Sequence, residues 1–410
     1  MTDPVSSIST TLREADLSVA SIRFVSDTVA ASLPAGKRVR IAATAGGFTP
    51  MMTGTIRTRR LVFAPARKQQ LEIGVHDVWS RLSETYPLMF DQLHEYGPAL
   101  HALGIPVEID GVDYTGPRAA LPDSYVLEPS YMDDSIDLTT GLLATRNARM
   151  SYLYVDRRGR LQLSSSLSDD VALIAADLPG QGDVSYSREL EVATDSAAIV
   201  NVVTVREHLL DADSYNDREV GSSDGPQGDL NRYFESTSQS ASYQDDASVE
   251  TYGPVTQTLP VVRGTGALAD VEAGDFGPSF QSQAQSILAA FANERYEFTR
   301  LTIPIESPAH IPLVAALQPF SAVAVRHKGT TQVVRPRSVK HTISPTGSQF
   351  GWYCELDFSI RRDQVYWLPP APDVDDPPLV GGFYDAPGPG VVDGGTPEST
   401  GIGIIDGGEL

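Results

Sequence analysis

Cysteine and long apolar runs are almost absent from this 410-residue chain. The single cysteine, Cys354, excludes an internal disulfide and any zinc site built from cysteine ligands. It lies in the strand-like run WYCELDFSI (352–360), so we expect a buried thiol with no chemical role. No apolar run reaches the ~18 residues that a membrane-spanning helix needs. The polar first 18 residues lack the apolar core of a signal peptide, so we expect no membrane insertion by this chain.

Basic residues are outnumbered in the composition. The chain has 31 Lys and Arg against 53 Asp and Glu, which leaves a formal net charge of −22. Such an excess favours solubility and repels phosphate, and no basic patch rises above the acidic background. We therefore expect no binding of duplex nucleic acid. The apolar fraction of 41% is enough for packed cores, so global disorder is not expected.

Short matches to catalytic and cofactor-binding motifs occur in the sequence, but the flanking elements that such motifs need are missing. Residues 221–225, GSSDG, match the nucleophile elbow G-x-S-x-G, but the strand before it and the helix after it are missing. Residues 264–269, GTGALA, imitate a dinucleotide fingerprint, but the sequence that follows breaks any helix. The seven histidines show no zinc-binding spacing, and the adjacent acids at 133–134 and 245–246 lie in loop-like sequence. We predict no catalytic, cofactor-binding or metal-binding residue, and no enzyme.

Two segments carry the clearest structural signals. Residues 151–165, SYLYVDRRGRLQLSS, alternate apolar and polar residues around a turn that includes Asp156 and Gly159, which predicts a tight β-hairpin. Residues 198–208, AIVNVVTVREH, form a β-branched run interrupted by one polar residue, Asn201. An amide in an apolar strand is typical of a side chain that bonds to neighbouring backbone. We predict structural roles for Asn201, Asp156 and Gly159.

The order of patterns predicts a mainly β, α+β chain. Residues 1–76 contain short strands, typical of a small barrel or sandwich, and residues 77–185 form an α+β part. Residues 186–368 are β-rich, with one helix at 281–295 and a long polar arm at 211–255.

The last segment, residues 369–410, has no Lys or Arg and is dense in Pro and Gly. It repeats VVDGG (391–395) as IIDGG (404–408), and its composition predicts an extended acidic tail without a core of its own. Six of its residues are apolar enough to dock on another subunit: Phe383, Tyr384, Val391, Val392, Ile404 and Ile405. The alternative is flexible disorder in the free protein.

Four stretches taken in order resemble a known family. They are GTIRTRRLVFAPARKQQLEIGVHDVWSRL (54–82), GLLATRNARMSYLYVDRRGRLQLSS (141–165), ELEVATDSAAIVNVVTVRE (189–207) and VRHKGTTQVVRPRSVKHTISPTGSQFGWYCELDFSI (325–360). In this order the chain resembles minor tail proteins of long-tailed phages (siphoviruses) that infect actinobacteria, specifically the baseplate-hub type. The resemblance covers nearly the whole chain, although each stretch taken singly carries little specificity.

The resemblance implies a fold and an assembly. It implies two small β-barrel-like hub domains separated by an inserted α/β part, with Asn201 near the point where the barrel resumes. It also implies a homotrimeric ring with pseudo-sixfold symmetry at the tail tip of the virion, assembled in the host cytoplasm. The implied partners are the distal tail protein, the tape-measure protein and other minor tail proteins, and genome DNA would pass through the lumen without specific binding.

Two other functions stay open from the sequence. A peripheral receptor- or carbohydrate-binding tail protein would use the aromatic residues of the polar arm: Tyr215, Tyr233, Phe234, Tyr243 and Tyr252. An envelope-degrading tail hydrolase would need residues such as Ser223 or Asp134, and we expect no such activity.

Overall fold

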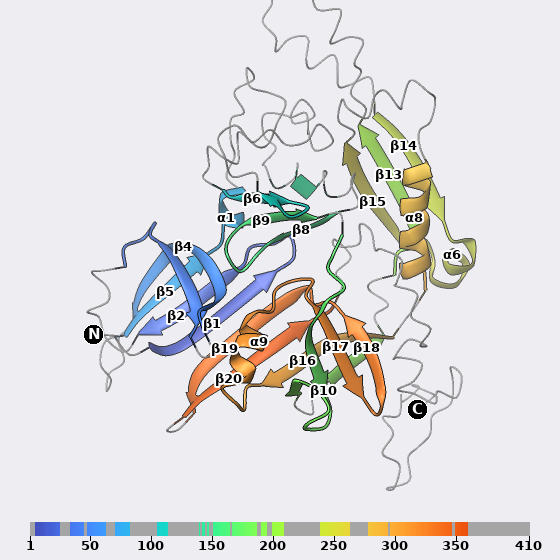
Figure 1. Ribbon diagram of the computed structural model, residues 1–410. Helices are drawn as coiled ribbons and strands as arrows, with labels where there is room; N and C mark the ends of the chain where they lie inside the picture. Colours follow the sequence, from blue (N-terminus) through green and yellow to red (C-terminus); the bar gives the residue numbers. More distant parts are fainter. Residues whose placement is uncertain are drawn as a thin grey trace, which may run out of the picture.

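The computed structural model describes much of the chain as β-strands arranged in four sheets (Figure 1). The described residues are 5–24, 33–44, 47–62, 70–82, 105–113, 139, 142–143, 146, 151–164, 166–186, 190–194, 199–208, 238–262, 278–293, 296–346 and 349–359. The predicted mainly β, α+β class is confirmed.

The first segment supplies five neighbouring strands. They are β1 (Val5–Arg13), β2 (Val19–Phe24), β3 (Arg38–Ala43), β4 (Thr49–Val62) and β5 (Gln70–His76). Strand β5 shows the alternation expected of a half-buried strand, since Leu71, Ile73 and Val75 are buried and their neighbours are more exposed. These side chains pack with those of β1 to β4 in one apolar core.

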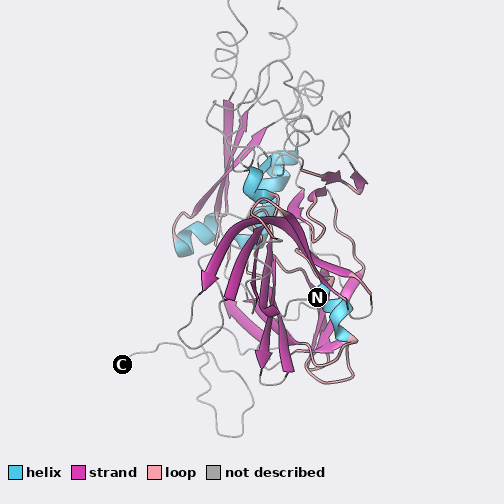
Figure 2. Cartoon of the chain, turned by 90° about the vertical axis from the view of Figure 1, so that its left-hand side faces the viewer, coloured by secondary structure: helices cyan, strands magenta, loops and turns pink. Residues whose placement is uncertain are grey.

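Strand β1 joins the N-terminal strands to strands from the last described part of the chain in a nine-stranded sheet. The sheet order is β12-β16-β20-β19-β1-β2-β5-β4-β3, where β12 is Leu190–Thr194, β16 is Tyr296–Pro304, β19 is Ser338–Thr346 and β20 is Gln349–Asp357. Strand β1 pairs with β19 from Ile8↔Ile343 to Arg13↔Ser338. The long strands arch strongly (Figure 2). Among the described strands the order has two ends, β12 and β3, so barrel closure stays a prediction.

A second sheet packs against the same region. Its order is β11-β10-β17-β18, formed by β10 (Val171–Ala176), β11 (Val184–Ser185), β17 (Ala322–His327) and β18 (Thr330–Val334). Helix α9 (His310–Ala315) connects two cores, because Val314 packs in the core of this region and Ala315 in the core of the first segment. Two strand pairs cross the predicted domain boundaries, the parallel pair β10–β17 and the pair β1–β19. Whether the predicted domains fold as separate units stays a prediction.

The predicted hairpin is confirmed as β8 (Tyr152–Val155) and β9 (Leu161–Ser164). These strands share a sheet with β6 (Val107–Ile109) and β7 (Val112–Asp113). Strand β5 continues to His76, and the short helix α1 (Trp79–Leu82) follows it. The Asp77 carboxylate then accepts the N–H of Trp79 (3.0 Å), as an N-cap does.

The last sheet forms a separate lobe with two helices, standing away from the large sheet in both views (Figures 1 and 2). It contains β13 (Val202–His208), β14 (Ser238–Gln244) and β15 (Thr256–Val262), with α6 (Asp246–Tyr252) and α8 (Pro278–Phe291). Helix α8 matches the predicted helix. The described end of the predicted polar arm, residues 238–255, forms regular elements: β14 pairs with the apolar β13, and the Asp245 side chain caps α6. No helix in the described part of the chain is long and apolar enough to cross a membrane.

Candidate functional site

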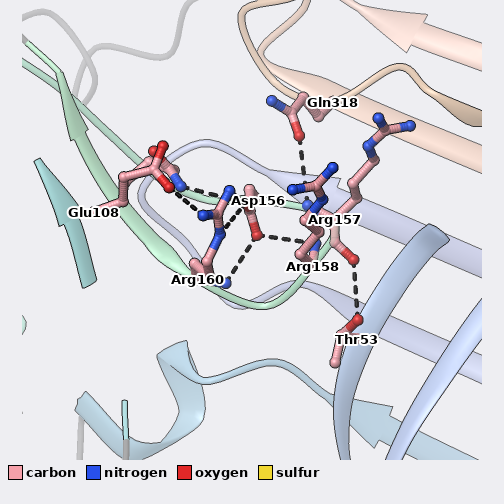
Figure 3. Close-up of polar contacts among 8 residues, drawn as sticks. Thr53, Glu108, Asp156, Arg157, Arg158, Arg160 and Gln318 are labelled. Carbon is pink, nitrogen blue, oxygen red and sulfur yellow. Dashed lines mark hydrogen bonds and ion pairs between the residues drawn. The ribbon is translucent and has the colours of Figure 1, made fainter. Parts of the chain in front are cut away.

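The turn of the β8–β9 hairpin lies where separate parts of the chain meet (Figure 3). The hydroxyl of Thr53, on β4, donates to the carbonyl oxygen of Arg157 (3.1 Å). On the other side, the N–H of Arg157 donates to Oε1 of Gln318, in the loop after α9 (3.5 Å). One turn residue therefore links the hairpin both to the nine-stranded sheet and to the loop that follows α9.

Asp156 holds the shape of this turn. Its Oδ1 accepts the backbone N–H groups of Arg158 (2.9 Å) and Arg160 (2.8 Å). Its Oδ2 accepts from the Arg160 side chain (3.0 Å) and from Gln162 (3.3 Å). Arg160 in turn forms an ion pair with Glu108 on β6. A carboxylate that accepts local backbone donors fixes a turn more firmly than backbone bonding alone, and this one also connects to the neighbouring strand.

Gly159 satisfies two independent constraints at the same turn. Its φ of +77° lies in the region that residues with a side chain rarely adopt. A Cβ at this position would also lie only 3.1 Å from both Cβ and the carbonyl oxygen of Thr53. Glycine therefore permits the turn and its close approach to β4.

A buried ion pair joins two distant segments of the chain close to this turn. Glu14, just after β1, accepts from Nη1 of Arg337, just before β19, at 2.8 Å, and their side chains are 0% and 9% exposed. The Arg337 guanidinium lies 5.0 Å from the ring centre of Phe320, which meets the rings of Tyr152 and Tyr154 edge-on. We call the set Thr53, Asp156, Gly159, Gln318, Glu14, Arg337 and Phe320 the junction. It ties the segments next to β1 and β19 to the hairpin.

Asn201 forms a second polar centre, inside the lobe. Its side chain is fully buried. Its Oδ1 accepts the N–H of Val255 (2.6 Å), and its Nδ2 donates to the carbonyl of Gly253 (2.7 Å) and to the Ser248 hydroxyl (3.2 Å). The amide thus ties the start of β13 to α6 and to the turn that leads into β15.

Cys354 and His341 are buried and face each other across β19 and β20. Burial raises the pKa of the Cys354 thiol, which favours its protonated form at neutral pH. Nδ1 of His341 accepts from Nε1 of Trp352 (3.3 Å), and burial lowers the pKa of His341 to about 4. The expectation of a buried cysteine is confirmed.

Several predicted site residues lie outside the described residues. These are the tail residues Phe383, Tyr384, Val391, Val392, Ile404 and Ile405, the candidates Ser223 and Asp134, and the arm aromatics Tyr215, Tyr233 and Phe234. Of the two described arm aromatics, Tyr243 packs against the core of the lobe, and Tyr252 is 39% exposed. Within the described ranges, no group of three or more His, Cys, Asp or Glu could hold a metal ion.

The sequence did not identify Thr53, Gln318, Glu14, Arg337 or Phe320 as members of a site. Their partners are distant in the chain, with Glu14 and Arg337 separated by 323 positions. No local pattern signals such a contact. By contrast, the turn residues Asp156 and Gly159 carry a local signal, because a tight hairpin needs polar and glycine residues at fixed positions.

A scan of protein-family models finds no match to this chain, and a search of curated proteins finds none either. Among solved structures, the chain is similar to a tail protein from Neisseria meningitidis, with a TM-score of 0.52 and 13% identity over 88% of this chain and 95% of that one. A 43 kDa prophage tail protein from Shewanella oneidensis gives a TM-score of 0.45 and 14% identity over 88% and 96% of the two chains. A type VI secretion component from E. coli gives 0.40 and 10% over 90% and 78%. The first likeness shows that this chain shares its fold with a tail protein over most of its length.

Proposed function

We propose that this chain is a structural, non-enzymatic subunit of a phage tail, placed in the baseplate hub at the tail tip. The observation that carries the proposal is the fold match to the Neisseria tail protein, which covers 88% of this chain and 95% of that protein. The match therefore concerns most of the length of both chains. The order of the four sequence stretches supports the same proposal and adds long-tailed phages of actinobacteria as the source.

The hub proposal includes a homotrimeric ring. The nine-stranded sheet has two halves with separate apolar cores, one from β1 to β5 and the other around β16, β19 and β20. Two such units per subunit would let three subunits present six contacts to a sixfold tail tube. The distal tail protein and the tape-measure protein would meet this ring, and other minor tail proteins would surround it.

The junction suits a part that carries load. A buried ion pair, a turn fixed by Asp156 and a ring cluster at Phe320 resist relative movement of the sheets. Genome DNA would pass through the lumen of the ring without specific binding.

Immunogold electron microscopy of particles that carry this chain tests the proposal. An antibody raised against the full chain is expected to label the tail tip. Label on the capsid, along the tail tube or at the ends of peripheral fibres would contradict the hub position. Fibre label together with glycan binding by the purified chain would favour the receptor-binding alternative.

A further inference from the structure

Six exposed basic residues belong to strands β3 and β4 or directly precede β3, in the N-terminal part of the large sheet. They are Lys37, Arg38, Arg40, Arg57, Arg59 and Arg60. Arg59 and Arg60 are adjacent on the part of β4 that pairs with β5, and they face opposite sides of the sheet. We therefore give the name arginine surface to Lys37, Arg38 and Arg40 alone. The absence of a basic patch, expected from the composition, does not hold for this sheet. Basic and acidic residues are distributed unevenly along the chain. Residues 1–82 contain eleven basic and six acidic residues, whereas residues 83–410 contain twenty basic and forty-seven acidic residues.

Arg38 and Arg40 project from the same face of β3. They alternate with Val39 and Ile41, which pack toward the core. Elsewhere on this sheet, exposed arginines have carboxylate partners: Arg23 lies 2.8 Å from Glu72, and Arg13 lies 3.2 Å from Asp16. Among the described residues Arg38 and Arg40 form no ion pair, so their charge is available to an acidic ligand.

Apolar and backbone groups adjoin the arginine surface. Phe48, just before the end of β4 that pairs with β3, is 63% exposed. Strand β3 ends the sheet order, so among the described strands nothing pairs with its outer edge. An edge of this kind can accept an added extended segment. The matching ligand is an extended acidic peptide that also carries large apolar side chains.

We propose that the arginine surface binds the acidic tail of the same chain, residues 369–410. The tail has eight carboxylate side chains, no Lys or Arg, and the apolar residues Phe383, Tyr384, Val391, Val392, Ile404 and Ile405. This differs from the expectation that the tail docks on another subunit. Because the tail and the arginine surface belong to the same chain, the effective concentration of the tail at this surface is high, about millimolar for a short connection.

The tail can reach this surface from its own sheet. Strand β20 ends at Asp357, and six strand spacings separate β20 from β3, a span of about 29 Å. Ten residues connect Ser359 to Pro369 and extend up to ~35 Å. Duplex DNA fits the surface less well, because residues 83–410 have a large acidic excess that would repel phosphate.

Zero-length carbodiimide cross-linking of the full chain tests this proposal, because the reagent joins a lysine to a carboxylate in contact with it. The chain has four lysines, Lys37, Lys68, Lys328 and Lys340. Lys37 lies in the arginine surface, and the exposed Lys328, between β17 and β18, is the internal control. Mass spectrometry is expected to find tail carboxylates joined to Lys37 about five times as often as to Lys328, and about 0.5 M salt is expected to remove the difference.

Two double variants separate the surface from general charge. Arg38→Ser with Arg40→Ser is expected to lower the Lys37–tail yield about fivefold. Arg13→Ser with Arg23→Ser removes the same charge from the same sheet, at arginines already paired with carboxylates, and is expected to leave the yield unchanged. All four arginines are exposed, so both variants should keep the wild-type circular dichroism spectrum.

Four results would overturn the proposal. They are equal yields at Lys37 and Lys328, an unchanged yield in the Arg38/Arg40 variant, cross-links between light and heavy chains in an isotopically mixed sample, and binding of a short duplex DNA that the Arg38/Arg40 variant loses. The mixed sample distinguishes the chain's own tail from that of a second copy. The test uses the isolated chain, so its failure would leave the hub proposal standing.

Discussion

Replacing Asn201 with alanine should destabilise the lobe formed by β13 to β15 and its helices. The substitution removes the acceptor of the Val255 N–H and the donors to the Gly253 carbonyl and the Ser248 hydroxyl. Each polar group left unpaired in a buried place costs about 1–3 kcal/mol, and Gly253 and Val255 are only half-buried, so water offsets part of that cost. We expect Asn201→Ala to lower the free energy of unfolding by about 3 kcal/mol.

Chemical denaturation followed by circular dichroism measures this change, and hydrogen exchange locates it in β13 and β15. Thr204→Ala is the matched control, because its side chain bonds Ser242 on the exposed face of the same strand and should cost less than about 0.5 kcal/mol. Asn201→Asp keeps an acceptor for Val255 but turns a carboxylate toward the Gly253 carbonyl, so it should be at least as destabilising as alanine. An unchanged melting temperature and normal particle assembly for Asn201→Ala would refute the reasoning.

Three further predictions concern the junction and the buried histidine. Gly159→Ala should cost about 1 kcal/mol more in unfolding free energy than Gly111→Ala, because both have φ near +80° but only Gly159 would place a Cβ against Thr53; equal losses in urea titrations would count against the close approach. Glu14→Ala should lower the free energy of unfolding by about 3–5 kcal/mol, because it removes the carboxylate that the buried Arg337 faces. Glu191→Ala, at the exposed pair with Arg300, should lower it by under about 1 kcal/mol. Similar shifts in melting temperature for the two variants would argue against the junction. The pKa of His341 is about 4 in the folded protein and near 6.5 in the unfolded chain, so the unfolded state binds more protons between these two pH values. The free energy of unfolding should therefore fall by up to ~3 kcal/mol as the pH drops from 6.5 to 4. His341→Gln should lose less stability over this range, and an identical pH profile would exclude the histidine as its cause.

Local patterns were enough to predict many of the elements. Strand β5, helix α8 and the β8–β9 hairpin each have alternating or helical apolar spacing within a few residues. The turn at Asp156 and Gly159 could be read in the same way, because its geometry depends on residues that are adjacent in the chain.

Strand β1 shows why other elements could not be predicted. Its sequence, VSSISTTLR, is rich in serine and threonine and looks polar. It becomes a strand because it pairs with both β2 and β19, and β19 lies over 300 residues away. Such a partner supplies hydrogen bonds and a buried neighbour that no local window contains.

The site was less accessible from the sequence than the fold. The ion pair of Glu14 with Arg337 depends on the β1–β19 pairing, so neither charge stands out in its own segment. The arginine surface was hidden for a different reason, since a net charge describes the whole chain and says nothing of how charges are distributed over its sheets.

Cryo-electron microscopy of the intact particle tests the central claim most directly. The account predicts three copies of this chain in a ring at the end of the tail tube, with the nine-stranded sheets surrounding the lumen. Six peripheral copies, a fibre-like position, or absence of the chain from the tail would contradict it.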